Sequence, residues 1–279
     1  MELSSDSDPV LSDAERAALG ALRSTHPAAS GMHKVNIAIA TVFTLVLMGA
    51  AVGFLIPALK APGKGMEIGT GIFAAIGLLP AIALCYLLVK LRWRLYLFDK
   101  GFVFARGSTR IVLWDDIQSL YDQQDVVSGI RADRWLRFLL QNGRRLTADS
   151  SYKDFASFAT FARDSVTKAV LARAAEELPA GRAIAFGKLM LSRAGLEKPG
   201  ESLAWAEVHG IVIEPRRDGQ VLADGVVVYK RGPRSQGVER KVEWYVKLAP
   251  RFGNVDAFLR LASQFTSIES PAQDRKSVV

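Results

Sequence analysis

The chain has 279 residues, a formal net charge of +8 at pH 7, a hydrophobic fraction of 49% and one cysteine. One cysteine excludes a disulfide framework and a cysteine-based zinc site. The positive charge suits an anionic partner, which for basic chains is commonly a membrane surface, an acidic protein or a nucleic acid. Because the sequence has no zinc-ligand spacing and no RNP-like aromatic run, we expect no nucleic-acid partner.

Residues 1–34 are polar, and we expect them to form a flexible cytoplasmic arm. Ser12 and Glu15 have the spacing of a capping box ahead of an apolar stretch, which predicts a short helix at this point. The hydrophilic side chains of the segment, Asp6 and Asp8 among them, argue against a cleaved signal peptide.

Two uncharged apolar runs follow, at residues 35–59 and 68–89. A bilayer core of about 30 Å needs roughly 20 helical residues, so each run is long enough to span it. A buried helical hairpin in a globular core is the alternative. The sequence therefore predicts a two-helix transmembrane hairpin, and with it an integral membrane protein of two spans.

The flanks of the two runs predict the orientation of this hairpin. Lys and Arg are in excess before the first run and after the second, and such an excess marks the cytoplasmic side. We therefore expect a multi-pass protein of the inner (plasma) membrane with both termini in the cytoplasm. Gly49 and Gly53 give the first run a face of small residues, suited to packing of the two spans or to a homo-oligomer formed through transmembrane helices.

From residue 92 onward, short alternating segments replace the continuous apolar runs, as is typical of β-strands. The strands expected in the first part are residues 93–98, 101–105, 109–113, 134–141 and 144–148. The dipeptide Asn142-Gly143 suits a tight turn between the last two. Ser151 precedes an apolar stripe that includes Phe155 and Phe158, so we expect a helix there.

The same order recurs in the second half of the chain. Residues Trp114-Asp115-Asp116-Ile117 match Trp205-Ala206-Glu207-Val208, with strands on both sides and a closing helix that begins after Asn254. We therefore expect two copies of one domain, at residues 92–178 and 182–268, followed by a disordered tail at 269–279. The two tryptophans are expected to fill the core of each copy.

The run Tyr96-Leu97-Phe98-Asp99-Lys100-Gly101-Phe102-Val103, followed by Val112-Leu113-Trp114-Asp115-Asp116-Ile117, resembles bacterial membrane-anchored proteins with tandem pleckstrin-homology-like (PH-like) domains. The resemblance covers about residues 92–175 and extends more loosely over 182–265. It implies an α+β fold, in which the transmembrane hairpin precedes two PH-like antiparallel β-barrels, each closed by a C-terminal helix. Many such proteins have no known biochemical function, so the resemblance implies a fold more than an activity.

No catalytic constellation is found in the sequence. His26, His33 and His209 have no carboxylate or thiol at a recognisable spacing, and there is no G-x-S-x-G elbow, P-loop or H-E-x-x-H motif. We therefore expect a protein that is not an enzyme and that uses no cofactor and no metal. The predicted function is a membrane-tethered binding or scaffold role, with two cytoplasmic PH-like domains that recognise a protein or peptide.

Basic residues of the second copy are the candidate contacts for a partner. They are Arg216, Arg217, Arg231, Arg234, Arg240 and Lys241. In one interpretation they form solvated loops that only keep the protein soluble. In the other they contact an acidic protein partner, or anionic lipid headgroups as an alternative function.

Overall fold

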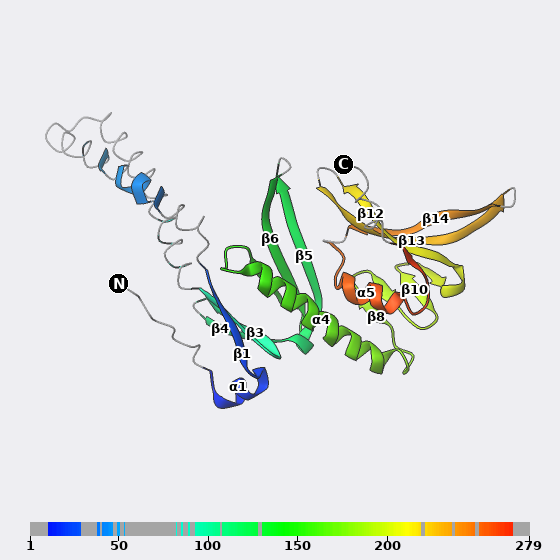
Figure 1. Cartoon of the computed structure of the whole chain (residues 1–279), viewed down its shortest axis with the longest axis horizontal. Helices are drawn as coiled ribbons and strands as arrows, with labels where there is room; N and C mark the ends of the chain where they lie inside the picture. The colour runs from blue at the N-terminus through cyan, green and yellow to red at the C-terminus, as the bar shows by residue number, and fades with distance from the viewer. Residues whose placement is uncertain are drawn as a thin grey trace, which may run out of the picture. The chain divides into compact units, whose positions relative to one another are not determined.

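The computed structural model describes residues 11–28, 38–39, 41–46, 49–50, 53, 82, 85, 89, 93–106, 108–127, 130–218, 221–235, 238–248 and 251–269. These residues form four β-sheets and a small number of helices (Figure 1). The chain divides into two compact units. One consists of Met1–Ile111 with Ser151–Phe155, and the other of Val112–Ser150 with Ala156–Val279.

The first unit is built on one sheet with the strand order β1-β2-β3-β4. The capping box predicted at Ser12 and Glu15 is present and begins α1 (Asp13–Leu19). The strands are β1 (Leu22–Pro27), β2 (Arg94–Phe98), β3 (Gly101–Arg106) and β4 (Ser108–Leu113). Leu95, Phe102 and Val103 are fully buried, so the two central strands supply the core of this unit.

Strand β1 comes from the segment that we expected to be a flexible arm. It pairs antiparallel with β2 and places the buried His26 opposite Leu95. The imidazole Nδ1 lies 2.9 Å from the Lys153 carbonyl oxygen. The Ala28 N–H donates to the Trp93 carbonyl at 3.0 Å. The two residues that flank the apolar runs, 28 and 93, therefore lie side by side.

The structure corrects the predicted transmembrane hairpin. Its spans, residues 35–59 and 68–89, lie largely outside the described residues, and within the described part of the chain no helix is both long enough and apolar enough to cross a bilayer. The two-span membrane partnership, the multi-pass inner-membrane localisation and a homo-oligomer formed through transmembrane helices lose their support accordingly. The length of an apolar run shows only that it suffices to span a bilayer if it is one continuous helix.

The second unit begins with a three-stranded sheet in the order β5-β6-β7. In chain order its elements are the 3-10 turn η1 (Trp114–Asp116), β5 (Ile117–Val127), β6 (Ile130–Leu140), β7 (Arg145–Asp149) and helix α4 (Phe155–Glu177). Alternation along the strands buries one face, which carries Leu136, Phe138 and Ala148. Helix α4 covers this face, with the Phe138 and Phe158 rings 6.3 Å apart, and Figure 1 shows the helix crossing the sheet.

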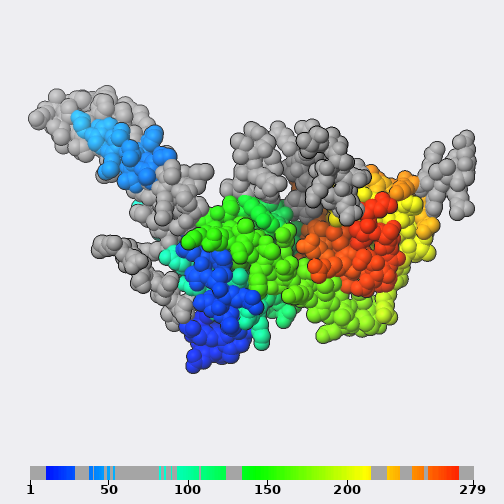
Figure 2. All heavy atoms as spheres, viewed as in Figure 1, coloured from blue at the N-terminus to red at the C-terminus, as the bar shows by residue number. Residues whose placement is uncertain are grey.

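The rest of the second unit forms two further sheets, in the orders β11-β10-β9-β8 and β14-β13-β12-β15. The elements are β8 (Ile184–Phe186), β9 (Leu189–Leu191), β10 (Gly195–Lys198), β11 (Glu201–Ala204), η2 (Trp205–Glu207), β12 (Val208–Asp218), β13 (Val221–Ser235), β14 (Val238–Leu248), α5 (Val255–Ala262) and β15 (Ile268–Glu269). The Phe186 ring lies 5.2 Å from that of Phe258, so α5 packs on β8. In Figure 2, α4 (green) and residues 251–269 (orange to red) both reach the visible face of this unit.

The predicted pair of closed barrels is wrong. The described chain is mainly β-sheet with few helices, and none of its four sheets closes on itself. The chain passes from one sheet to the next through η1 after β4, and again through η2 after β11. Alternation of apolar and polar residues indicates which face of a strand is buried, but it does not fix which strands share ladder hydrogen bonds. The domain boundaries 92–178 and 182–268 stay predictions.

Candidate functional site

The six basic residues predicted as partner contacts do not come together. Arg216 and Arg217 lie on β12 close to its turn into β13. The other four lie where β13 turns into β14, and they are Arg231, Arg234, Arg240 and Lys241. A strand rises about 3.3 Å per residue, so the length of β13 separates the two groups by roughly 25–40 Å. The side chains at 216, 217, 234 and 240 lie outside the described residues.

Each of the two repeat tryptophans begins a 3-10 turn. Trp114 is buried, and its ring lies 6.1 Å from that of Phe161. Trp205 is half-buried and stacks on Phe265 with the ring centroids 4.7 Å apart. Its Nε1–H donates to the Ser192 carbonyl at 3.0 Å. Packing and hydrogen bonding within the unit therefore account for both indoles.

Gly49 and Gly53, predicted for helix packing, belong to the described residues. At either glycine, no described atom lies within 4 Å of the position that a Cβ would occupy. A close contact between helices would place backbone or side-chain atoms within that distance. The part of the chain that the structure describes thus holds no packing partner at these two glycines.

A cavity of about 330 Å³ opens on the sheet of β5, β6 and β7. We call it the cationic groove, and its lining residues are Tyr121, Gln123, Arg137, Leu139, Arg145 and Arg251. Half of them are arginines, and no Asp or Glu is found among the described residues that line it. The described lining therefore carries positive charge and no negative charge, and low-dielectric walls strengthen the field of such charges.

The strand register explains why these side chains meet. Tyr121 lies directly opposite Arg137, and Leu139 lies directly opposite Arg145. Residues directly opposite each other in an antiparallel pair point to the same face of the sheet. This face is the one opposite α4, because the alternate residues, Phe138 among them, are buried beneath the helix.

Arg251 reaches the groove from the segment that precedes α5, and Asn254 attaches this segment to β5. The backbone N–H of Asn254 donates to the Leu120 carbonyl at 2.9 Å. Its side-chain Oδ1 accepts from the Leu120 N–H, and its Nδ2 donates to the Gln118 carbonyl, both at 2.8 Å. Asn254 is buried and adopts the left-handed conformation at φ 56°, which asparagine tolerates better than most residues. The three hydrogen bonds fix the position of Arg251 relative to the strand.

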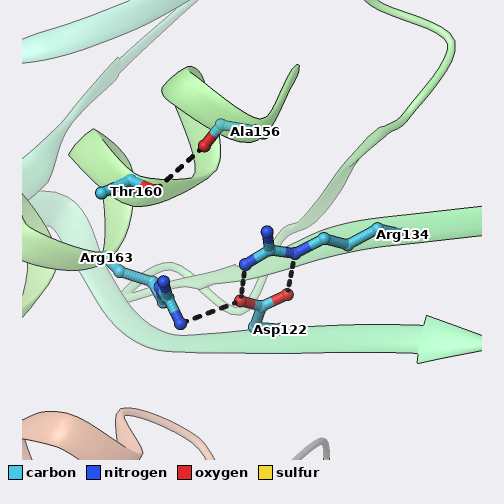
Figure 3. A network of polar contacts seen from close by, with 5 residues as sticks. All are labelled: Asp122, Arg134, Ala156, Thr160 and Arg163. Atoms are coloured by element: carbon cyan, nitrogen blue, oxygen red, sulfur yellow. Dashed lines mark hydrogen bonds and ion pairs between the residues drawn. The ribbon is translucent and has the colours of Figure 1, made fainter. Parts of the chain in front are cut away.

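On the opposite face of the same sheet, one carboxylate contacts two arginines (Figure 3). Arg134 donates two hydrogen bonds to the carboxylate of Asp122, with the Nε–Oδ1 distance at 2.9 Å, and this interaction raises the pKa of Arg134. Arg163 of α4 lies 3.5 Å from the same carboxylate. One acid thus contacts two arginines on the helix side, whereas no acid is found among the described residues that line the groove.

A second cavity in this unit, of about 430 Å³, has a mixed lining. Its polar members are Gln118, Gln141, Arg173 and Glu177. Arg173 already donates to the Asp115 and Ile117 carbonyl oxygens, at 3.0 and 3.3 Å. Because its single arginine is engaged and an acid lies beside it, this cavity has less to offer an anion than the cationic groove. Among the described residues there is also no group of three or more His, Cys, Asp or Glu that could hold a metal ion.

Arg137 and Arg251 were missed because neither has an adjacent basic residue in the sequence, whereas Arg145 directly follows Arg144 after the Asn142-Gly143 turn. The signal that places Arg137 and Arg145 on one face of the sheet is the alternation of polar and apolar residues along β6 and β7. Arg251 carries no local signal. It joins the other two only through Asn254, which lies more than a hundred residues away from Leu120 along the chain.

Fold and groove together define a mainly β-sheet protein with an arginine-lined groove on one of its sheets. The model of a family of unknown function, DUF6585, matches residues 7–226, well over half of the chain. The chain therefore belongs to this family. No curated protein matches the chain.

Proposed function

We propose that this protein is a non-enzymatic binding module whose cationic groove holds an acidic segment of a partner protein. The observation that carries the proposal is the lining of the groove, in which three of the six described residues are arginines and none is an Asp or Glu. Guanidinium groups bind carboxylates with two parallel hydrogen bonds, which gives directional specificity in addition to charge attraction. The positive charge of the whole chain favours the approach of an acidic partner.

The remaining lining residues suit a peptide. Leu139 offers apolar contact for carbon atoms, while Tyr121 and Gln123 offer hydrogen bonds.

Fluorescence anisotropy of a short, labelled polyglutamate peptide with the full-length chain tests the proposal. We expect binding that weakens as salt is added, because exposed charge pairs are screened. Replacing Arg137, Arg145 and Arg251 together by alanine should reduce the affinity about tenfold or more, since hydrogen bonds to charged groups contribute about 1.5–3 kcal/mol each.

The matched control is a second triple variant with Arg182, Arg193 and Arg260 replaced by alanine. These arginines are exposed, belong to the same unit and lie outside the groove lining, so this variant changes the net charge by the same amount. It should bind the peptide almost as well as the parent chain. Equal losses in both variants, or none in either, would contradict the proposal.

Anionic lipid is the competing ligand, and the basic residues near the β13–β14 turn are its candidate contacts. Vesicles that contain phosphatidylserine distinguish the two cases. Two results together would overturn the proposal and favour lipid recognition. The chain would bind these vesicles but not the peptide, and vesicle binding would be lost when Arg231, Arg234, Arg240 and Lys241 are replaced by alanine.

A further inference from the structure

The polar groups that line the cationic groove are hydrogen-bond donors almost throughout. The guanidinium groups of Arg137, Arg145 and Arg251 can only donate, and Tyr121 and Gln123 each have a donor in addition to an acceptor. A peptide backbone presents donors and acceptors in equal number, so it would use only part of such a lining. The lining suits a group that consists of acceptors alone.

The charge of the groove lining also distinguishes between a carboxylate and a phosphate as the bound group. Three guanidinium groups line it without an acid among the described lining residues, whereas on the helix side one carboxylate, Asp122, already binds Arg134 and lies 3.5 Å from Arg163. A carboxylate carries one negative charge. A phosphate monoester carries about −1.5 to −2 at neutral pH and has three strong acceptor oxygens.

The strand register also places two of the arginines, Arg137 and Arg145, within reach of one group. Leu139 faces Arg145 directly across β6 and β7, and Arg137 lies two residues before Leu139, so Arg137 and Arg145 are diagonal neighbours on one face. Diagonal neighbours are about 7–8 Å apart, a separation that two arginine side chains can bridge. Tyr121 stands directly opposite Arg137, and Leu139 lies between the basic residues as an apolar contact.

From the donor-rich lining, the absence of an acid among the described lining residues and this spacing, we infer that the group taken by the groove is a phosphate monoester on a partner protein, as in a phosphoserine or phosphothreonine side chain. The inference rests on the proposed function, since it specifies the acidic group within the bound segment. Arg137 and Arg145 hold the phosphate oxygens from the strands, and Arg251 approaches from the segment that Asn254 attaches to β5.

The test compares three short peptide libraries with degenerate flanks and a fixed central residue: phosphoserine, glutamate or serine. Each labelled library is titrated with the full-length chain, and binding is followed by anisotropy. We expect the phosphoserine library to bind about tenfold tighter than the glutamate library or better, because of its second charge and third acceptor oxygen. The serine library should show no saturable binding. The Arg137, Arg145 and Arg251 alanine variant should lose the phosphoserine preference, and the Arg182, Arg193 and Arg260 variant should keep it.

The outcomes separate this inference from the proposed function. If glutamate and phosphoserine libraries bind equally, and both depend on the groove arginines, the groove still binds acidic segments but the phosphate assignment falls. If neither library binds, both fall. If vesicles that carry a phosphoinositide bind at the groove arginines and the phosphoserine library does not, the phosphate comes from a lipid and the inference is overturned.

Discussion

At the scale of single residues, the sheet of β5, β6 and β7 separates two arginine environments by side. Arg134 is paired with Asp122 on the side of α4, and both side chains are about one quarter exposed or less, at 26% and 21%. Arg137 and Arg145 lie on the other side, where the groove has no lining acid among the described residues. The strand period of two is what separates these neighbours in sequence onto opposite faces.

Replacing Asp122 by asparagine should destabilise the fold, because two hydrogen bonds to Arg134 lose their charge and a partly buried guanidinium loses its counter-ion. Hydrogen bonds to charged groups contribute about 1.5–3 kcal/mol, and urea unfolding measures the loss. Replacing Arg163 by alanine is the comparison: its contact is longer and its side chain is 39% exposed, so the cost should stay under about 1 kcal/mol. A larger loss from Arg163 than from Asp122 would contradict this account.

Tyr245 gives a prediction for high pH. Burial, and then the negative charge that Tyr121 acquires when it ionises, raise the pKa of Tyr245 above its ordinary value of 10.0. The folded state therefore keeps this proton longer than the unfolded state does. The resulting stability is complete below about pH 10 and is lost as the pH rises through the folded-state pKa. Tyr245→Phe should lose less stability than the parent chain between pH 9 and pH 11 in urea unfolding. Identical pH profiles for the two proteins would refute the assignment.

At the scale of elements, Asn254 attaches the segment before α5 to β5 as a neighbouring strand residue would. It forms hydrogen bonds with both the N–H and the C=O of Leu120, and the adjacent Gly253 approaches Ser119 so closely that a Cβ would make a tight contact. A Cβ at Gly253 would lie 3.0 Å from the Ser119 Cβ. The close approach of Gly253 and the left-handed conformation of Asn254 together allow the segment to reach the strand.

Asn254→Gly keeps the left-handed conformation but removes both side-chain hydrogen bonds and leaves the Leu120 N–H without its partner. We expect a loss of about 2–3 kcal/mol in the free energy of unfolding, measured in urea. Asn254→Ala should cost about 1 kcal/mol more, because a Cβ disfavours φ 56°. At denaturant concentrations where both variants are folded, peptide binding should also weaken, since Arg251 loses its anchor. Alanine and glycine variants as stable as the parent chain would show that the attachment contributes nothing.

The sequence predicted individual elements better than their arrangement. The capping box at Ser12 fixes α1 through contacts three residues apart, and alternation identified strands such as β2, β3 and β7 because burial of one face imposes it locally. The long strands β5, β12 and β13 were not predicted. The pairing of β1 with β2 across the two apolar runs has no local signal, and neither has the contact of Asn254 with Leu120. The groove depends on the contact of Asn254 with Leu120, which the sequence does not indicate. The predicted partner contacts were therefore adjacent basic residues such as Arg216 and Arg217.

At the scale of the whole molecule, the basic residues do not act as one uniform surface. The structure places Arg134 beside Asp122, Arg137, Arg145 and Arg251 in the lining of the cationic groove, and further basic residues near the turns of β12, β13 and β14. The net charge of +8 attracts anionic partners in general, but only local geometry selects where they bind. The position of the groove arginines therefore matters for binding as much as the net charge does.

The arginine Nε–Hε signals in an NMR correlation spectrum of the full-length chain test this claim most directly. After assignment by single Arg→Lys variants, the labelled chain is titrated with the short polyglutamate peptide. The account predicts that the signals of Arg137, Arg145 and Arg251 shift with one common affinity, while those of Arg134 and Arg173, already bonded to Asp122 and to backbone carbonyls, stay in place. Shifts confined to Arg216, Arg217, Arg231, Arg234 and Arg240, or no saturable shift at all, would contradict it.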